Sequence, residues 1–251
     1  MPGIFVERII AAQVDRVWSL TQDPKLHERW DLRFTKIEYL PRDRPEEPQR
    51  FRYETRIGFG LAIAGEGETV GERNAENGSR TSALKFWSDS PVSLIRQGSG
   101  YWQYEPADEA TIFRTRYDYE VRWGGAGRAL DRLFRPIMGW ATAWSFDALR
   151  LWAEREVPPE LSRLRAVVHG ISRLTLAIVW LYHGLVPKLL FPEKGERELT
   201  RMAGVPSDFV PSFILGLGLV ECAFGLAMLL MWHRRWLLTG QIPVLLLIPL
   251  S

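Results

Sequence analysis

Glu221 raises the most direct chemical question in this chain, because it is a carboxylate near the middle of a long apolar run, Phe209 to Trp232. Burying an ionised carboxylate in hydrocarbon costs several kcal/mol, so we expect Glu221 to be neutral, paired or facing a cavity. The candidate partners on the preceding apolar run are Arg173, His183 and Lys188.

Helical spacing favours two of these partners. His183 and Lys188 are five residues apart and share an α-helical face poorly, whereas Arg173 and His183 are ten apart and nearly share one. We therefore predict a His183–Glu221 or Arg173–Glu221 contact between two membrane helices. Such a contact is either a structural interhelical hydrogen bond or part of a functional site.

Other site chemistries find little support in the sequence. The single cysteine, Cys222, excludes an intrachain disulfide and Cys₄ or Cys₂His₂ metal sites. A net charge of +2 does not require a nucleic-acid partner. We therefore expect no metal, no cofactor and no nucleic acid. The histidines are scattered along the chain: His27, His169, His183 and His233.

The last third of the chain is built for a membrane. A spanning helix needs roughly 20 apolar residues. Phe209 to Trp232 meets this length, and Leu174 to Leu190 reaches it with the residues just before it. A third run, Trp236 to Leu250, is short and contains two prolines, so it would span only with tilt or bilayer thinning. We predict an all-α transmembrane bundle of about three helices over residues 158–251, the alternative for each run being a buried helix of a soluble protein.

Basic residues predict the orientation of this bundle. A cluster of arginines precedes the first run, and Arg234-Arg235 lies between the second and third. By the positive-inside rule, these segments face the cytoplasm. The N-terminus lacks the pattern of a cleavable signal peptide. We therefore expect an inner (cytoplasmic) membrane protein with a cytosolic N-terminal domain. The arginines of the cluster are Arg150, Arg155, Arg163, Arg165 and Arg173.

Residues 1–157 have the pattern of a water-soluble α+β domain. A strand near 4–12 precedes two short helices, the second starting at Asp23-Pro24. Period-two alternation predicts antiparallel strands at 51–57 and 113–123, with further strands near 64–75, 81–88 and 93–105. After Gly124-Gly125 the period returns to 3.6, with Pro136 either kinking a long helix or marking its start. Its predicted buried stripe is Leu130, Phe134, Ile137, Ala141, Trp144, Ala148 and Leu151.

This layout resembles the START-like, or SRPBCC, superfamily of polyketide cyclase/dehydrase and lipid-transport type. The resemblance covers residues 3–155, with glutamine at position 13 where the family usually has proline. It implies a helix-grip fold, in which a curved antiparallel sheet and a long C-terminal helix hold a hydrophobic ligand. The residues that carry it are Ile9 to Leu20, Asp23-Pro24, Trp30-Asp31, Gly100 to Pro106 and Thr115 to Val121.

The strand positions expected to face that ligand are unusually aromatic. Either these side chains fill a core or they line a cavity, because buried Tyr and Trp need hydrogen-bond partners that a ligand or waters can supply. The predicted ligand-binding residues are Phe51, Tyr53, Trp87, Trp102, Tyr104, Tyr117, Tyr119, Trp140 and Trp144.

The membrane region resembles the DoxX-like family over about residues 168–250. The residues that carry this resemblance are Ile178 to Leu190, Glu193, Glu196, Gly216 to Glu221 and Gly225-Leu226. The family usually forms a four-helix membrane unit, and this chain stops where a fourth helix is expected. Some distant relatives are subunits of quinone-linked sulfur oxidoreductases, so the resemblance leaves redox chemistry open.

Three functions fit this sequence. The first is a membrane-anchored module that binds a lipid, isoprenoid or quinone-like molecule. The second is an enzyme of cyclase/dehydrase or quinone-linked redox type, and the third is a structural or sensory membrane subunit. Inward strand positions hold Tyr and Thr rather than Asp, Glu or His, which favours binding over acid–base catalysis. A homo-oligomer and a membrane partner subunit both remain open.

Overall fold

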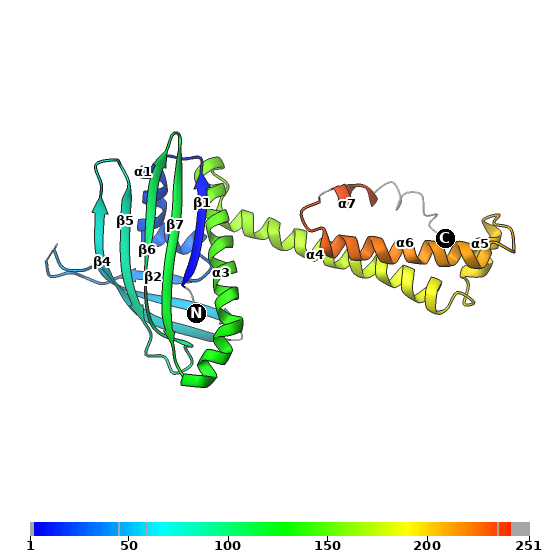
Figure 1. Ribbon diagram of the computed structural model, residues 1–251, viewed down its shortest axis with the longest axis horizontal. Coiled ribbons are helices and arrows are strands. Elements are labelled where there is room, and N and C mark those ends of the chain that lie inside the picture. The colour runs from blue at the N-terminus through cyan, green and yellow to red at the C-terminus, as the bar shows by residue number, and fades with distance from the viewer. Residues whose placement is uncertain (1–2, 45, 59, 235, 242–251) are drawn as a thin grey trace. The chain divides into compact units, whose positions relative to one another are not determined.

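The computed structural model describes residues 3–44, 46–58, 60–234 and 236–241 (Figure 1). The chain divides into two compact units, Met1–Arg163 and Leu164–Ser251.

The first unit is built on a seven-stranded antiparallel sheet with the order β1-β7-β6-β5-β4-β3-β2. Alternating exposure along the strands gives the sheet one wet face and one inner face, as period-two patterning predicts. The predicted antiparallel sheet is confirmed, with one additional four-residue strand, β2. The strands are β1 (Ile4–Ile10), β2 (Lys36–Tyr39), β3 (Arg50–Gly58), β4 (Leu61–Asn74), β5 (Arg80–Trp87), β6 (Ile95–Ala107) and β7 (Ala110–Val121).

Three helices accompany the sheet: α1 (Val14–Gln22), α2 (Pro24–Trp30) and α3 (Gly124–Arg155). Asp23 caps α2, because its side chain accepts hydrogen bonds from the backbone N–H groups of Lys25 and Leu26, at 2.8 and 3.3 Å. The long helix α3 begins at Gly124, so Pro136 does not mark its start. Figure 1 shows α3 running beside β1 at one edge of the sheet.

The buried face of α3 differs from the predicted one. Leu130 and Ile137 of the predicted stripe are exposed. Ala148 of the stripe is buried and Phe134 packs against the core, but the helix also buries Asp131, Thr142, Ser145, Phe146 and Leu149. At 100° per residue, this buried side lies roughly 100° around the helix from the predicted stripe. Two groups of residues account for the rotation. Phe146 and Leu149 are fully buried in the core, and the buried tyrosine hydroxyls of the inner sheet face require polar partners on the helix.

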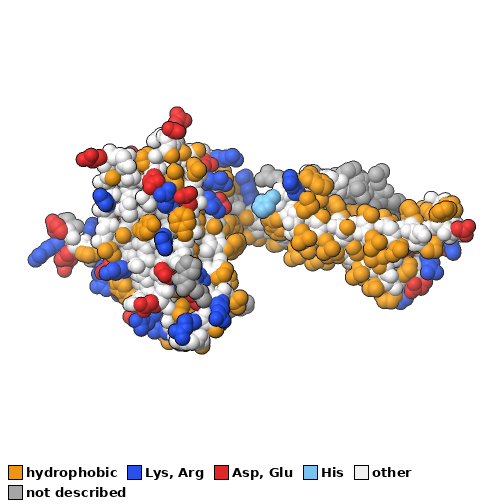
Figure 2. Space-filling view, viewed as in Figure 1, with side chains coloured by type: hydrophobic (Ala, Val, Ile, Leu, Met, Phe, Trp, Pro, Cys, Tyr) orange, Lys and Arg blue, Asp and Glu red, His pale blue; other side chains and the backbone are white. Residues whose placement is uncertain are grey.

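The second unit contains α4 (Pro159–His183), which begins in the first unit, then η1 (Gly184–Leu190), α5 (Glu196–Met202), α6 (Val210–Leu230) and α7 (Trp236–Thr239). Two of its helical segments, Pro159–Leu190 and Val210–Leu230, are long and apolar enough to cross a membrane. Only 11% and 22% of their most apolar stretches are buried inside the protein, so most apolar side chains face outward, as in helices surrounded by lipid. Figure 2 shows this continuous hydrophobic surface. Most of the third predicted span lies outside the described residues.

Candidate functional site

The inner face of the sheet carries aromatic rings that lie across glycines of a neighbouring strand. A methyl group added at any of these glycines would overlap the far edge of the facing ring. Because glycine has no side chain, each ring lies low over the sheet rather than standing up from it. The three pairs are Phe51 over Gly67, Tyr53 over Gly65 and Phe86 over Gly98.

One half of this inner face is tightly packed, and the other half is open. Over β1, β7 and β6, the core is closed by side chains such as Trp102, Tyr104, Phe113, Phe146 and Leu149. Over β3 to β5, the inner side chains stay half-buried. We call this half the open floor and define it by Phe51, Tyr53, Leu84 and Phe86. An apolar ligand placed there would cover aromatic and aliphatic surface that the protein alone leaves accessible.

A buried charged cluster lies beside the open floor. The Arg33 guanidinium donates two hydrogen bonds to the Asp31 carboxylate, at 2.9 and 2.6 Å. His27 Nε2 lies 3.0 Å from the same carboxylate. The His27 ring contacts Phe34, which in turn contacts Tyr53 of the open floor. The structure therefore brings a histidine–carboxylate pair to the border of the aromatic surface.

Asp31 is held as a carboxylate by its neighbours. Complete burial alone would raise the pKa of the Asp31 carboxyl. The charge of Arg33, together with hydrogen bonds from Arg33 and His27, outweighs that effect, so the pKa of Asp31 lies well below its usual range. The same pairing raises the pKa of the Arg33 guanidinium against the lowering effect of its burial.

Tyrosine hydroxyls join the sheet to α3 and α1. Tyr119 donates to the Asp131 carboxylate at 2.7 Å, and the hydroxyls of Tyr117 and Thr142 are 2.8 Å apart. Burial, reinforced by the bond to Asp131, raises the pKa of Tyr119 above its usual range. On the open floor, burial raises the pKa of Tyr53 to about 12. These phenols therefore stay protonated at neutral pH and act as hydrogen-bond donors.

The structure separates the predicted ligand-binding aromatics into groups. Trp102, Tyr104, Tyr117 and Tyr119 are buried in the packed core, whereas Phe51 and Tyr53 lie on the open floor. Trp87 pairs with Gln97 and Glu66, so strand alternation puts it on the wet face, opposite to Phe86. Trp140 is exposed and packs against the half-buried Trp144, with ring centroids 5.1 Å apart. Phe51 and Tyr53 are therefore the predicted residues best placed to touch a ligand.

Sequence reasoning missed His27, Asp31 and Arg33 as a cluster. A signal was present in the spacing, because His27 and Asp31 are four residues apart at the end of a short helix and so share its face. We predicted that Tyr and Thr rather than Asp, Glu or His face the ligand, but that prediction was based on the strand positions alone. The cluster comes from α2 and the turn after it.

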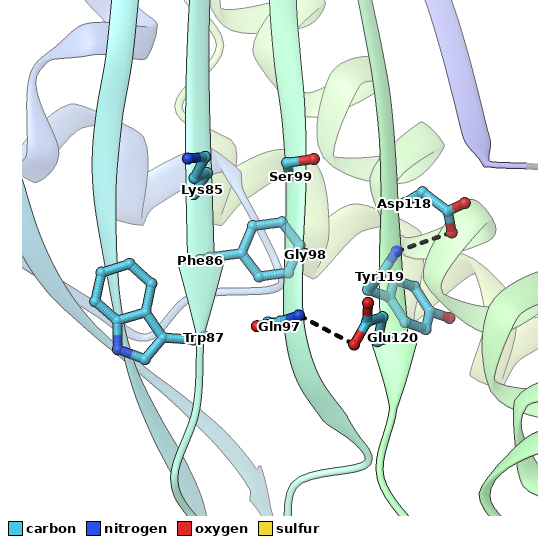
Figure 3. A pocket seen from close by; sticks show the side chains of 9 residues that line it. All are labelled: Lys85, Phe86, Trp87, Gln97, Gly98, Ser99, Asp118, Tyr119 and Glu120. Carbon is cyan, nitrogen blue, oxygen red and sulfur yellow. Dashed lines mark hydrogen bonds between the residues drawn. The ribbon is translucent and has the colours of Figure 1, made fainter. Parts of the chain in front are cut away.

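A concavity of about 540 Å³ crosses β5, β6 and β7 (Figure 3). Its lining includes the exposed charged residues Lys85, Asp118 and Glu120 of the wet face. Gln97 spans part of it by donating to Glu120 at 3.0 Å. Phe86 of the open floor also lines this groove, together with Trp87 and Tyr119, so aromatic rings and charged groups share it.

In the second unit, Glu221 pairs with Lys188. Their charged groups are 3.1 Å apart, and Glu196 lies 3.5 Å from the same Lys188 nitrogen. The predicted His183–Glu221 contact is therefore wrong, and His183 is exposed. The reason is the close packing of η1, a π-helix, against α6, where the Cβ of Lys188 lies over Gly218, three residues before Glu221. The Lys188 ammonium also donates to the carbonyl oxygen of His183 at 3.4 Å.

Arg173 does not contact Glu221 either, which corrects the other predicted pairing. Its fully buried guanidinium donates to three backbone carbonyl oxygens at and beyond the end of α6, those of Met228, Met231 and Arg234, at 2.8, 3.0 and 2.6 Å. The last carbonyls of a helix have no partners within the helix, and a cation is favoured beside them. Arg173 therefore caps α6 from the neighbouring helix α4.

We expect Arg173→Met to loosen this capped end of α6. Removing a hydrogen bond to a charged group costs about 1.5–3 kcal/mol of stability, and methionine keeps the length of the side chain but donates none. The free energy of unfolding in mixed detergent micelles, followed by helical circular dichroism, should fall by about this amount. Arg201→Met, which changes an exposed arginine, is the matched control and should leave it unchanged.

Among the described residues, no group of three or more His, Cys, Asp or Glu side chains is arranged to hold a metal ion.

Solved structures are similar to part of this chain at low sequence identity. Protein jhp0584 of Helicobacter pylori is 17% identical with a TM-score of 0.49, and the alignment covers 61% of this chain and 88% of that one. TTHA0849 from Thermus thermophilus is 22% identical with a TM-score of 0.46, covering 59% and 94%. The STAR-related lipid transfer protein from Xanthomonas axonopodis is 16% identical with a TM-score of 0.44, covering 58% and 84%.

Sequence comparisons cover more of the chain. A relative from Bacillus subtilis (strain 168), the "uncharacterized membrane protein YndG", is 41% identical over 239 residues, which are 94% of this chain and 80% of that protein. The DoxX-like family matches residues 177–251. The family described as polyketide cyclase / dehydrase and lipid transport matches residues 1–168. With its helix-grip sheet followed by a DoxX-like membrane region, the chain belongs to the polyketide cyclase/dehydrase and lipid transport family.

Proposed function

We propose that this protein is a membrane-anchored binder of a hydrophobic small molecule, of the lipid, isoprenoid or quinone class, which it holds on the open floor. The observation that carries the proposal is the half-buried aromatic surface of Phe51, Tyr53 and Phe86, laid low over strand glycines. An apolar ligand would remove this surface from water at about 25 cal/mol per Å² of apolar area. The Tyr53 hydroxyl and the charged cluster of His27, Asp31 and Arg33 would supply the few polar contacts of the ligand.

The membrane unit gives this binder its location. Two outward-facing apolar helices and the DoxX-like match favour anchoring in the bilayer. We further propose that the N-terminal unit is cytosolic, because arginines gather before the first span and Arg234 follows the second.

The histidine–carboxylate pair favours a second candidate function, acid–base catalysis on the bound molecule. His27 lies 3.0 Å from Asp31, and a carboxylate in that position can orient and stabilise a histidine that exchanges protons. Binding remains the better supported function, because an aromatic surface serves a binder without further groups. Unchanged ligand on prolonged incubation of the loaded protein would support binding, whereas a product missing from a His27→Gln sample would support catalysis.

Photocrosslinking of the full-length protein in nanodiscs tests the binding proposal. A fatty acid carrying a diazirine is added, and the labelled peptides are identified by mass spectrometry. We expect label on β3 to β5 and about a tenfold loss of that label in Phe51→Ala, since losing much of one buried aromatic contact costs about 1.5 kcal/mol. Phe5→Ala, on an exposed position of β1, is the matched control and should change nothing. Label restricted to residues 164–241 would contradict the proposal.

A further inference from the structure

The N-terminal half of α3 presents an exposed apolar stripe. Its four members recur at steps of three and four residues, so they share one face of the helix. A helix inside a soluble domain normally turns such a face toward the core. We call this surface the α3 stripe and define it by Leu130, Leu133, Ile137 and Trp140, whose exposed fractions are 50%, 73%, 58% and 62%.

Other contacts of the first unit occupy the remaining sides of α3. The side facing the sheet carries Asp131 and Thr142, which bond to tyrosines of β7. The side facing β1 carries Asp147, which pairs with Arg8, and Glu154, which accepts from the backbone N–H of Ala11. At 100° per residue, the α3 stripe lies roughly 150° around the helix from Asp131 and Thr142, so it points away from the inner face of the sheet, and Trp140 lies within about 20° of Asp147.

The exposed charges on the N-terminal half of α3 are of one sign. Between Gly124 and Trp140, the exposed charged side chains are those of Arg128 and Arg132. The acidic residue of this segment, Asp131, is buried and is held by Tyr119 and by Arg135, at 2.7 and 2.9 Å. This segment therefore carries leucine, isoleucine and tryptophan on one face, and its exposed charged residues are arginines. Helices that lie in a membrane interface have this composition.

We propose that the α3 stripe docks on the surface of an anionic lipid bilayer, with Leu133, Ile137 and Trp140 entering the interface and the two arginines meeting lipid phosphates. A second copy of the chain is a poorer occupant, because a two-fold contact through this face would bring its arginines together. Tethering by the membrane helices keeps the bilayer at a high effective concentration, so even weak docking becomes populated. Docking rests on membrane anchoring and does not depend on ligand binding.

Spin-label accessibility in the full-length protein tests this docking directly. Leu133→Cys is labelled with a nitroxide in a Cys222→Ala background, in nanodiscs of phosphatidylglycerol and phosphatidylcholine. A label among lipid tails collides often with oxygen and rarely with a water-soluble nickel chelate. We expect this pattern at position 133. Val70→Cys, an exposed apolar position on β4, is the control and should show the opposite, water-exposed pattern.

Two further measurements make the outcome decisive. Adding Ile137→Asp, or replacing the anionic lipid by pure phosphatidylcholine, is expected to raise nickel accessibility at position 133 at least several-fold. High nickel accessibility at position 133 in the anionic nanodiscs would overturn docking. Low accessibility to both reagents would overturn it in favour of a protein partner or a second copy. Lipid-like protection that persists equally in pure phosphatidylcholine would overturn the assignment to an anionic surface. None of these outcomes alters the crosslinking result expected for Phe51.

Discussion

Asp31→Asn is expected to lower the free energy of unfolding of the N-terminal unit by about 3–5 kcal/mol, the usual cost of breaking a buried ion pair by removing one partner. Asp31 is fully buried and receives two hydrogen bonds from Arg33, whose side chain is itself largely buried. Asparagine preserves the shape but leaves the guanidinium without its carboxylate. The measurement is urea unfolding of the full-length protein in nanodiscs, followed by tryptophan fluorescence.

Two variants provide the controls for this experiment. Glu160→Gln removes the partner of Arg29 in an exposed ion pair, so we expect a loss below about 1 kcal/mol. Asp31→Asn combined with Arg33→Met removes both charges and should recover a large part of the stability lost by Asp31→Asn alone. Equal losses for Asp31→Asn and Glu160→Gln would show that the buried pair is not a principal support of the fold.

The contribution of Asp31 should also depend on pH. Its pKa in the folded protein is depressed, while an unfolded chain protonates aspartate near pH 4. The stabilisation is therefore complete above about pH 4 and declines as the pH falls toward the lower folded pKa. The difference in unfolding free energy between the native protein and Asp31→Asn should shrink below about pH 4. A difference that stays constant from about pH 7 to about pH 2 would contradict this assignment.

Lys188→Met is expected to destabilise the membrane unit by about 3–5 kcal/mol, because it leaves two carboxylates in a largely apolar setting. Lys188 lies 3.1 Å from Glu221 and 3.5 Å from Glu196, and its side chain is only 8% exposed. Helix loss in SDS-containing micelles, followed by circular dichroism, reports this change.

A double-mutant cycle separates the Lys188–Glu221 interaction from general damage. Lys188→Met combined with Glu221→Gln should be more stable than Lys188→Met alone, because one unpaired carboxylate has been removed. His183→Ala is the matched control, since the exposed His183 is the partner that α-helical spacing favoured for Glu221. A loss at His183 as large as that at Lys188 would contradict the observed pairing.

Local pattern accounts for most of the secondary structure. Period-two alternation in β3 and β7 and the Asp23-Pro24 signal for α2 are properties of neighbouring residues, so they are readable without knowing the fold. The apolar runs likewise identify the two membrane-length helices, because hydropathy depends on composition alone. The order of these elements then carries the resemblance that the family match confirms.

Tertiary structure decided which side chains meet. The buried side of α3 could not be read from hydrophobic periodicity, because Tyr117 and Tyr119 require Thr142 and Asp131 opposite them, and this leaves the apolar stripe outside. Lys188 reaches Glu221 because η1 packs against Gly218 of α6, a contact between segments that are distant in the sequence. The sequence by itself determined a helix-grip domain joined to apolar membrane helices. Long-range contacts decided which polar groups pair and which apolar face of α3 stays exposed. Their geometry cannot be read from the pattern of neighbouring residues.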